Sequence, residues 1–111
     1  MSLGEGWQRT HTCGALRSEH AATSVTLNGW VAARRDHGGI YFVDLRDRYG
    51  LTQVVLSEEV VGELKLAPED VLCVRGEVRL REERNINPNR ETGKVEVVAE
   101  SVEVLSESKL P

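Results

Sequence analysis

The sequence predicts an all-β fold, in which five strands close a small Greek-key barrel and a short helix lies between strands three and four. Two observations predict it. Apolar and polar residues alternate along several short segments, which is the pattern of half-buried strands, and turn-forming residues separate these segments. One segment, which begins at Ser57, has helical spacing instead. The 111 residues, 40% of them hydrophobic, suffice for one domain with one core.

The first strand is expected over residues 25–35, with its odd-numbered residues from 25 to 31 facing the core. Gly29 lies inside this strand, which predicts a bulge or a sharp bend there. The residues at 36–39 include two glycines and predict a hairpin turn into the second strand.

The second strand, residues 40–46, decides the character of the outer surface. If Tyr41, Val43 and Leu45 face the core, Phe42 faces outward. The opposite phase would bury Phe42, but it would also bury Asp44, which is costly unless that carboxylate is paired. The outward phase is therefore favoured, and a turn at 48–50 leads to a third strand over residues 51–56.

The helix is expected to begin after Ser57, whose hydroxyl can cap it, and to continue through Leu64 toward Pro68. The fourth strand follows over residues 72–81. Its even-numbered residues from Leu72 to Leu80 are expected to face inward, and Cys73 is expected to face outward with the arginines. A polar loop at 85–93 precedes the fifth strand, at 95–99, which can continue to residue 104.

Three strands, a helix and two strands is the element order of the OB-fold, whose second and third strands and flanking loops bind oligonucleotides. An SH3-like barrel or a short sandwich would give a similar alternation. Cys13 and Cys73 are expected to be free thiols in a reducing cytoplasm, since they form no disulfide framework or metal-ligand spacing. No secretory signal or membrane-spanning run is evident.

The formal net charge of −4 argues against sequence-blind coating of DNA, which depends chiefly on neutralising phosphates. The arginines are nevertheless clustered, at 34–48 and at 75–90, while glutamates dominate elsewhere. This distribution is compatible with a local site for a nucleic-acid strand. No metal-ligand spacing and no catalytic constellation are evident in the sequence.

Phe42 can stack a base, and Gln53 on the neighbouring strand can read a base edge with its amide. Arg35 can make a forked contact with a purine or a phosphate, or else only a surface ion pair with Asp44. Glu96 among arginines can accept hydrogen bonds from a base such as guanine, or it can simply balance the charge of a neighbouring arginine.

Several closely spaced sequence motifs resemble those of a known protein family. They lie at residues 9–11, 13–14, 25–31, 34–39, 44–55, 85–87 and 92–97. Together they closely resemble the N-terminal anticodon-binding domain of bacterial-type aspartyl-tRNA synthetases. The resemblance covers residues 9–111 and leaves residues 1–8 as an N-terminal extension. It implies an OB-fold that binds the anticodon loop of tRNA(Asp).

The resemblance also implies roles for individual residues. Phe42 would stack on the middle base, a uracil, and Gln53 would read that base. Arg35 and Glu96 would read the first base, guanine or its queuine derivative. His37 stands where family members that also charge tRNA(Asn) tend to carry histidine, so it is the candidate specificity residue and tRNA(Asn) is a candidate second partner.

Five further positions carry implied contacts. Arg79, Asn85 and Asn87 would contact the third base, a cytosine, and the backbone near it. Arg34 and Arg81 match positions that contact the RNA backbone. Asn85 argues against relaxed specificity, because relaxed family members often have glycine there.

The parent enzyme implied by this family makes Asp-tRNA from aspartate, ATP and tRNA, using ATP and Mg²⁺ in a catalytic domain that lies beyond this segment. It is expected to be a cytoplasmic homodimer, and this segment is expected to bind without catalysing and to need no cofactor or metal. Three alternatives remain. The first is the equivalent domain of a lysyl- or asparaginyl-tRNA synthetase, and the second is a free-standing module that binds single-stranded nucleic acid. A structural barrel whose outer face binds protein is a third.

Overall fold

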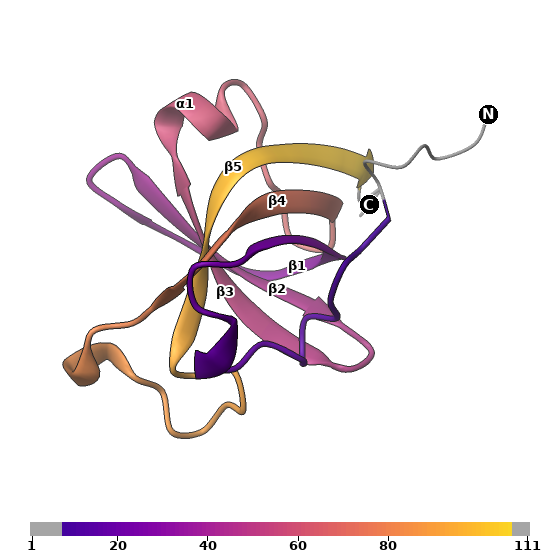
Figure 1. Cartoon of the computed structure of the whole chain (residues 1–111). Coiled ribbons are helices and arrows are strands. Elements are labelled where there is room, and N and C mark those ends of the chain that lie inside the picture. Colours follow the sequence, from indigo (N-terminus) through magenta and orange to yellow (C-terminus); the bar gives the residue numbers. More distant parts are fainter. Residues whose placement is uncertain (1–7, 108–111) are drawn as a thin grey trace.

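Residues 8–107 of the computed structural model form a closed five-stranded barrel in the order β1-β2-β3-β5-β4 (Figure 1). All neighbouring strands are antiparallel except β3 and β5. The elements are β1 (Ser24–His37), β2 (Ile40–Asp47), β3 (Gly50–Ser57), α1 (Glu58–Val61), β4 (Val71–Leu80) and β5 (Val95–Ser106). The predicted fold is confirmed. Of the predicted N-terminal extension, only Gln8 is among the described residues.

The barrel is filled by aliphatic side chains from every strand, and the predicted inward faces of β1 and β2 are confirmed. Val25, Leu27 and Val31 are buried, as are Val43 and Leu45. Tyr41 packs against the same cluster from its edge. Since neighbouring residues of a strand point to opposite faces, this places Phe42 on the outer face of β2.

The bulge in β1 lies further along the strand than predicted, between Val31 and Ala33 rather than at Gly29. Gly29 instead permits a close approach between strands, because a Cβ atom there would lie 2.5 Å from the carbonyl oxygen of Arg46. The bulge reverses the alternation of side chains beyond it. Arg35 therefore pairs with Phe42 and shares its outer face.

The helix begins where predicted but is shorter. The backbone N–H of Val60 donates to the Ser57 hydroxyl over 3.3 Å, so Ser57 is the N-cap. The single turn ends at Gly62, whose φ of 55° takes the chain out of helical geometry. Leu64 was expected to continue the helix, but it lies beyond this end and is exposed.

Two residues of β4 differ in exposure from the predicted alternation, although Cys73 keeps its predicted outward face and lies outside the core cluster. Cys73 is buried, because the longer residues Asn28 and Glu103 flank it on the neighbouring strands. Leu80 is 55% exposed, because the end of β4 extends to the edge of the barrel, where its side chain meets a surface pocket and not the core.

Cys13 and Cys73 are both buried thiols that form no disulfide among residues 8–107, as expected. Burial raises the pKa of both, which keeps them protonated at neutral pH. Within residues 8–107 the α-helix is a single turn, and no helix there is long enough to cross a bilayer.

Candidate nucleic-acid interface

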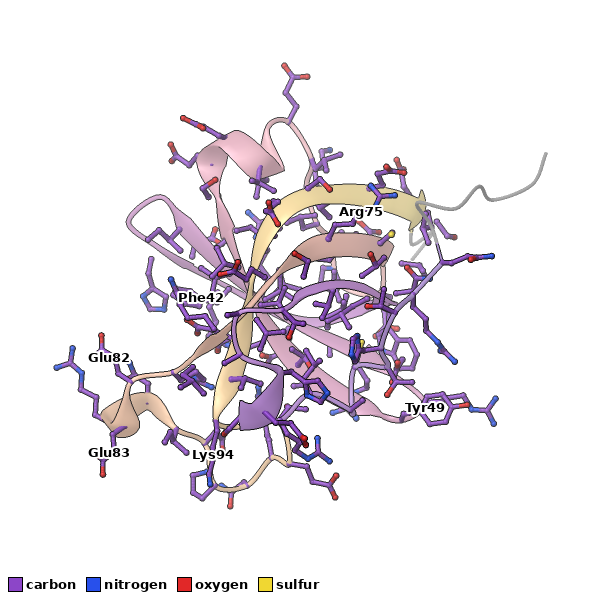
Figure 2. The ribbon with its side chains drawn as sticks, in the orientation of Figure 1. Phe42, Tyr49, Arg75, Glu82, Glu83 and Lys94 are labelled. Carbon is purple, nitrogen blue, oxygen red and sulfur yellow. The ribbon has the colours of Figure 1, made fainter. Side chains whose placement is uncertain are left out.

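A concave pocket of about 650 Å³ opens between the β1–β2 hairpin and the segment that follows β4. Figure 1 shows the hairpin and this orange segment extending from the same side of the barrel, and Figure 2 shows Phe42 on that side. The lining combines one aromatic ring, one primary amide and several charged groups. Its residues are Arg35, His37, Phe42, Gln53, Arg79, Leu80, Arg81, Glu82, Asn85 and Glu96.

Strand register brings the aromatic and cationic groups together. Phe42 pairs with Arg35 across β1 and β2, and the His37 ring meets the Phe42 ring edge-on at 5.5 Å between centroids. Phe42 lies outside the buried core cluster and lines the pocket. An aromatic ring beside a guanidinium group is the usual arrangement for stacking an unpaired base.

Gln53 forms the middle of the pocket floor and is held by two side chains. Its Oε1 accepts from Arg35 Nη2 at 3.2 Å, and its Nε2 donates to Glu96 Oε1 at 2.8 Å. Each contact uses only part of the amide's capacity, so one N–H and one lone pair remain. A fixed amide with one donor and one acceptor left can pair with the edge of a single base.

Glu96 lies on β5 beside this amide, since β3 and β5 are paired strands, and it is only 8% exposed. Arg79 Nε donates to its Oε2 at 3.0 Å, and Arg81 Nε lies 3.9 Å from its Oε1. Glu96 therefore balances arginine charge and lines the pocket, while its contact with a base stays a prediction. Arg81 Nε is buried without a hydrogen-bond partner among residues 8–107.

Asp44 is a buried carboxylate under the pocket whose full role the sequence did not reveal. It accepts two hydrogen bonds from Arg35, at 3.1 and 3.2 Å, and two from Arg90, at 3.1 and 3.0 Å. Burial opposes its ionisation, but the four hydrogen bonds outweigh that effect and hold the pKa of Asp44 below its usual value. The contact with Arg90 ties the β4–β5 loop to the outer face of the sheet.

The structure places most of the predicted site residues in this pocket, but it leaves two outside it. Arg34 forms an ion pair with Asp36, lies over the Tyr41 ring and donates to the carbonyl of Lys65. Asn87 lines a different pocket, and its Oδ1 accepts from the backbone of Asn89.

Leu80 and Glu82 line the pocket without having been predicted as site residues. Leu80 was not predicted as a site residue because the alternation along β4 assigned its side chain to the core. Glu82 was not predicted because no local sequence pattern marks it. Among residues 8–107 no group of three or more His, Cys, Asp or Glu side chains could hold a metal ion.

The barrel and the pocket on its outer face define an oligonucleotide-binding OB module. Residues 25–105 match the family of OB-fold nucleic acid binding domains, and the chain belongs to this family. The chain is 54% identical over 110 residues to an aspartate–tRNA(Asp/Asn) ligase of Salinibacter ruber, covering 93% of the chain and 17% of that relative. A ligase of the same name from Acidobacterium capsulatum is 49% identical over 109 residues, covering 94% of the chain and 18% of that relative.

Solved structures share the fold. The chain matches an aspartyl-tRNA synthetase from Entamoeba histolytica with a TM-score of 0.81 at 23% identity, covering 96% of this chain and 23% of that one. It matches an asparaginyl-tRNA synthetase from Pyrococcus horikoshii with a TM-score of 0.70 at 28% identity, covering 91% and 24%. The chain thus spans less than a quarter of each of these four proteins.

Proposed function

We propose that this chain is the anticodon-binding domain of an aspartate–tRNA ligase and that it takes the GUC or QUC anticodon of tRNA(Asp). The observation that carries the proposal is the convergence of Phe42, Gln53 and Glu96 in one pocket. A ring, an amide and a carboxylate supply one stacking surface and two reading groups. High identity to aspartate–tRNA(Asp/Asn) ligases supports the same assignment.

The bases are assigned as the resemblance to aspartyl-tRNA synthetases implies, and the groups that line the pocket are chemically compatible with that assignment. The middle uracil stacks on Phe42 and pairs with the remaining donor and acceptor of Gln53. The first guanine donates from its Watson–Crick edge to Glu96, with Arg35 beside it. Arg79 and Asn85 contact the third base. Arg81 holds the backbone nearby, whereas Arg34 and Asn87 can contact only RNA that extends beyond the pocket.

The proposal includes relaxed reading of the third base, so that tRNA(Asn) is a second partner. His37 lines the pocket against Phe42, and the relatives are named as ligases for both tRNAs. The whole protein is proposed to be a cytoplasmic homodimer that makes Asp-tRNA from aspartate, ATP and tRNA. ATP and Mg²⁺ would be used in a separate catalytic domain, and this domain would need no cofactor.

Titration of anticodon stem-loops tests the assignment. Stem-loops bearing GUC, GUU, UUU and a scrambled triplet should bind in that order, with GUU close to GUC and the scrambled loop weakest. Binding of GUC no tighter than the scrambled loop would reject the assignment and favour a general single-strand module. Preference for UUU would favour the lysyl branch, and preference for GUU over GUC would favour the asparaginyl branch.

The variant Glu96→Gln should lower discrimination in favour of guanine at the first position by roughly tenfold, because an amide cannot accept both donors of the guanine edge. The ratio of the dissociation constants for GUC and AUC stem-loops measures this effect. Glu82→Gln is the matched control, since Glu82 lines the same pocket but makes no contact with Gln53. Equal ratios for the two variants would remove Glu96 from base reading.

A further inference from the structure

Most arginines of the chain form ion pairs with carboxylates, although Asp44 and Glu96 are each shared by two of them. Eight of them form ion pairs: Arg17, Arg34, Arg35, Arg75, Arg79, Arg81, Arg84 and Arg90. Arg9, Arg46 and Arg48 are exposed and have no ion-pair partner among residues 8–107. These three gather around the turn between β2 and β3, which places three arginines without an ion pair at one corner of a chain whose net charge is −4.

The centre of this corner is Tyr49, whose side chain is 55% exposed. The guanidinium carbons of Arg9 and Arg48 lie 5.4 and 5.5 Å from the centroid of its ring. Stacking against a ring leaves the N–H groups at the edge of a guanidinium free to donate to a phosphate. Figure 2 shows Tyr49 on the opposite side of the barrel from the loop that carries Glu82 and Glu83.

The turn that carries Tyr49 is held rigidly. Asp47 accepts from the backbone N–H groups of Cys13, Tyr49 and Gly50, at 2.8, 2.8 and 3.1 Å. These bonds engage both oxygens of its carboxylate, which explains why the neighbouring arginines form no ion pair with it. Gly50 also packs on Gly14, where a Cβ atom would approach to 2.6 Å. The turn that presents Tyr49 is therefore fixed in place before any ligand binds.

This corner continues the outer face that carries the base pocket. Phe42, Asp44 and Arg46 alternate along that face of β2, so Arg46 lies about 13 Å from Phe42 along the strand. Arg46 and Tyr49 line a second pocket of about 440 Å³, together with Arg90. Arg90 and Arg35 both bind the Asp44 carboxylate, which therefore lies between the two pockets.

We infer that Arg46, Arg48 and Tyr49, together with Arg9, form a second RNA contact, which holds the sugar–phosphate backbone of nucleotides flanking the triplet. The inference rests on the proposed function, because it takes the RNA strand to run from the base pocket along the outer face of β2. A protein partner fits less well, since the centre of a protein interface is depleted of charged residues and this corner gathers three arginines. Tyr49 is the one large hydrophobic residue exposed at this corner, while Ile40, Leu64 and Leu80 are exposed elsewhere among the described residues.

Titration of the whole chain with a GUC stem-loop over a range of salt concentrations tests the contact. Arg46→Gln and Arg48→Gln should each weaken binding of the stem-loop by about threefold. Each should also make the fall of log K for binding with log salt concentration less steep, by about 0.7 in the magnitude of the slope. The ratio of GUC to scrambled binding should not change, since backbone contacts carry no sequence information. Arg75→Gln is the matched control, because it removes the same charge from the ion pair with Glu103, away from both pockets.

A second arm locates the contact. In this experiment each phosphate that flanks the triplet is replaced in turn by an uncharged methylphosphonate. One of these replacements should weaken binding to the unmodified protein, but it should not weaken binding to Arg46→Gln any further, because that variant already lacks the contact. The inference would be overturned if the losses of affinity from Arg46→Gln and from each phosphate replacement were additive at every flanking phosphate. It would also be overturned if the salt slopes of Arg46→Gln and Arg48→Gln equalled that of Arg75→Gln. Either result would favour a protein partner for this corner. Loss of triplet preference in the unmodified chain would instead reject the proposed function, so the two failures are distinct.

Discussion

Replacing Phe42 with alanine is expected to weaken the binding of a GUC stem-loop by roughly five- to 150-fold, or about 1–3 kcal/mol. The ring lies outside the core and lines the pocket beside His37, so its removal deletes the stacking surface and leaves the barrel intact. Fluorescence titration of the stem-loop measures the loss, and thermal unfolding checks that the variant is folded.

Two matched variants make this expectation specific. Ile40→Ala removes an exposed side chain from the same face of β2 but outside the pocket, so it should leave affinity unchanged. Phe42→Trp keeps a ring for stacking and should retain most of the binding. If Phe42→Ala and Ile40→Ala bound the stem-loop with equal affinity, the Phe42 ring would not be the surface on which a base stacks.

The position of Phe42 was predictable because one local pattern contains it. Tyr41, Val43 and Leu45 alternate with it, and the opposite phase would have turned Asp44 and Arg46 into the apolar interior of the barrel. Asp44 is buried nonetheless, but on the outer face, where Arg35 and Arg90 pair with it. The position of Arg35 was not predictable in the same way. Its shared face with Phe42 depends on the bulge at Val31 and Ala33, and the sequence pointed to Gly29 instead. Closure of the barrel, which is a property of all five strands, decides where the extra residue lies.

The β4–β5 loop shows the same limit more strongly. The sequence indicates that residues 85–93 form a polar loop, but not where its side chains go. Asn87 turns back on its own loop, and Arg90 reaches Asp44, which lies 46 positions earlier in the chain. Leu80 lines the pocket because β4 ends at the rim of the barrel. These placements follow from contacts between distant segments, which no periodicity encodes.

The paired arginines explain how an acidic chain could present the proposed RNA site. Arg35 and Arg79 are each held by a buried carboxylate, so their guanidinium groups are oriented before RNA arrives and lose less entropy on binding. The distant glutamates act weakly at the pocket, because salt screens charges beyond about 8 Å at physiological ionic strength. Local arrangement therefore outweighs the net charge of −4.

Asp44 is the carboxylate on which this orientation depends most, and Asp44→Asn is expected to destabilise the fold. The amide is uncharged and cannot accept the four bonds from Arg35 and Arg90. Hydrogen bonds to a charged group contribute about 1.5–3 kcal/mol. We expect the lower part of that range, because the two arginine side chains are 41% and 26% exposed. Urea unfolding at neutral pH measures the difference.

The pH dependence separates a charge effect from a packing effect. Because the pKa of Asp44 is lowered in the folded state, its stabilisation is complete above the unfolded value of about 3.9 and is lost as pH falls through the folded value. The gap in unfolding free energy between the unmodified chain and Asp44→Asn should therefore shrink below about pH 4. Asp36→Asn breaks only the exposed pair with Arg34 and should differ from the unmodified chain by less than about 0.5 kcal/mol. A gap for Asp44→Asn that stays constant into acid would show that packing, and not the carboxylate charge, holds Arg35 and Arg90 in place.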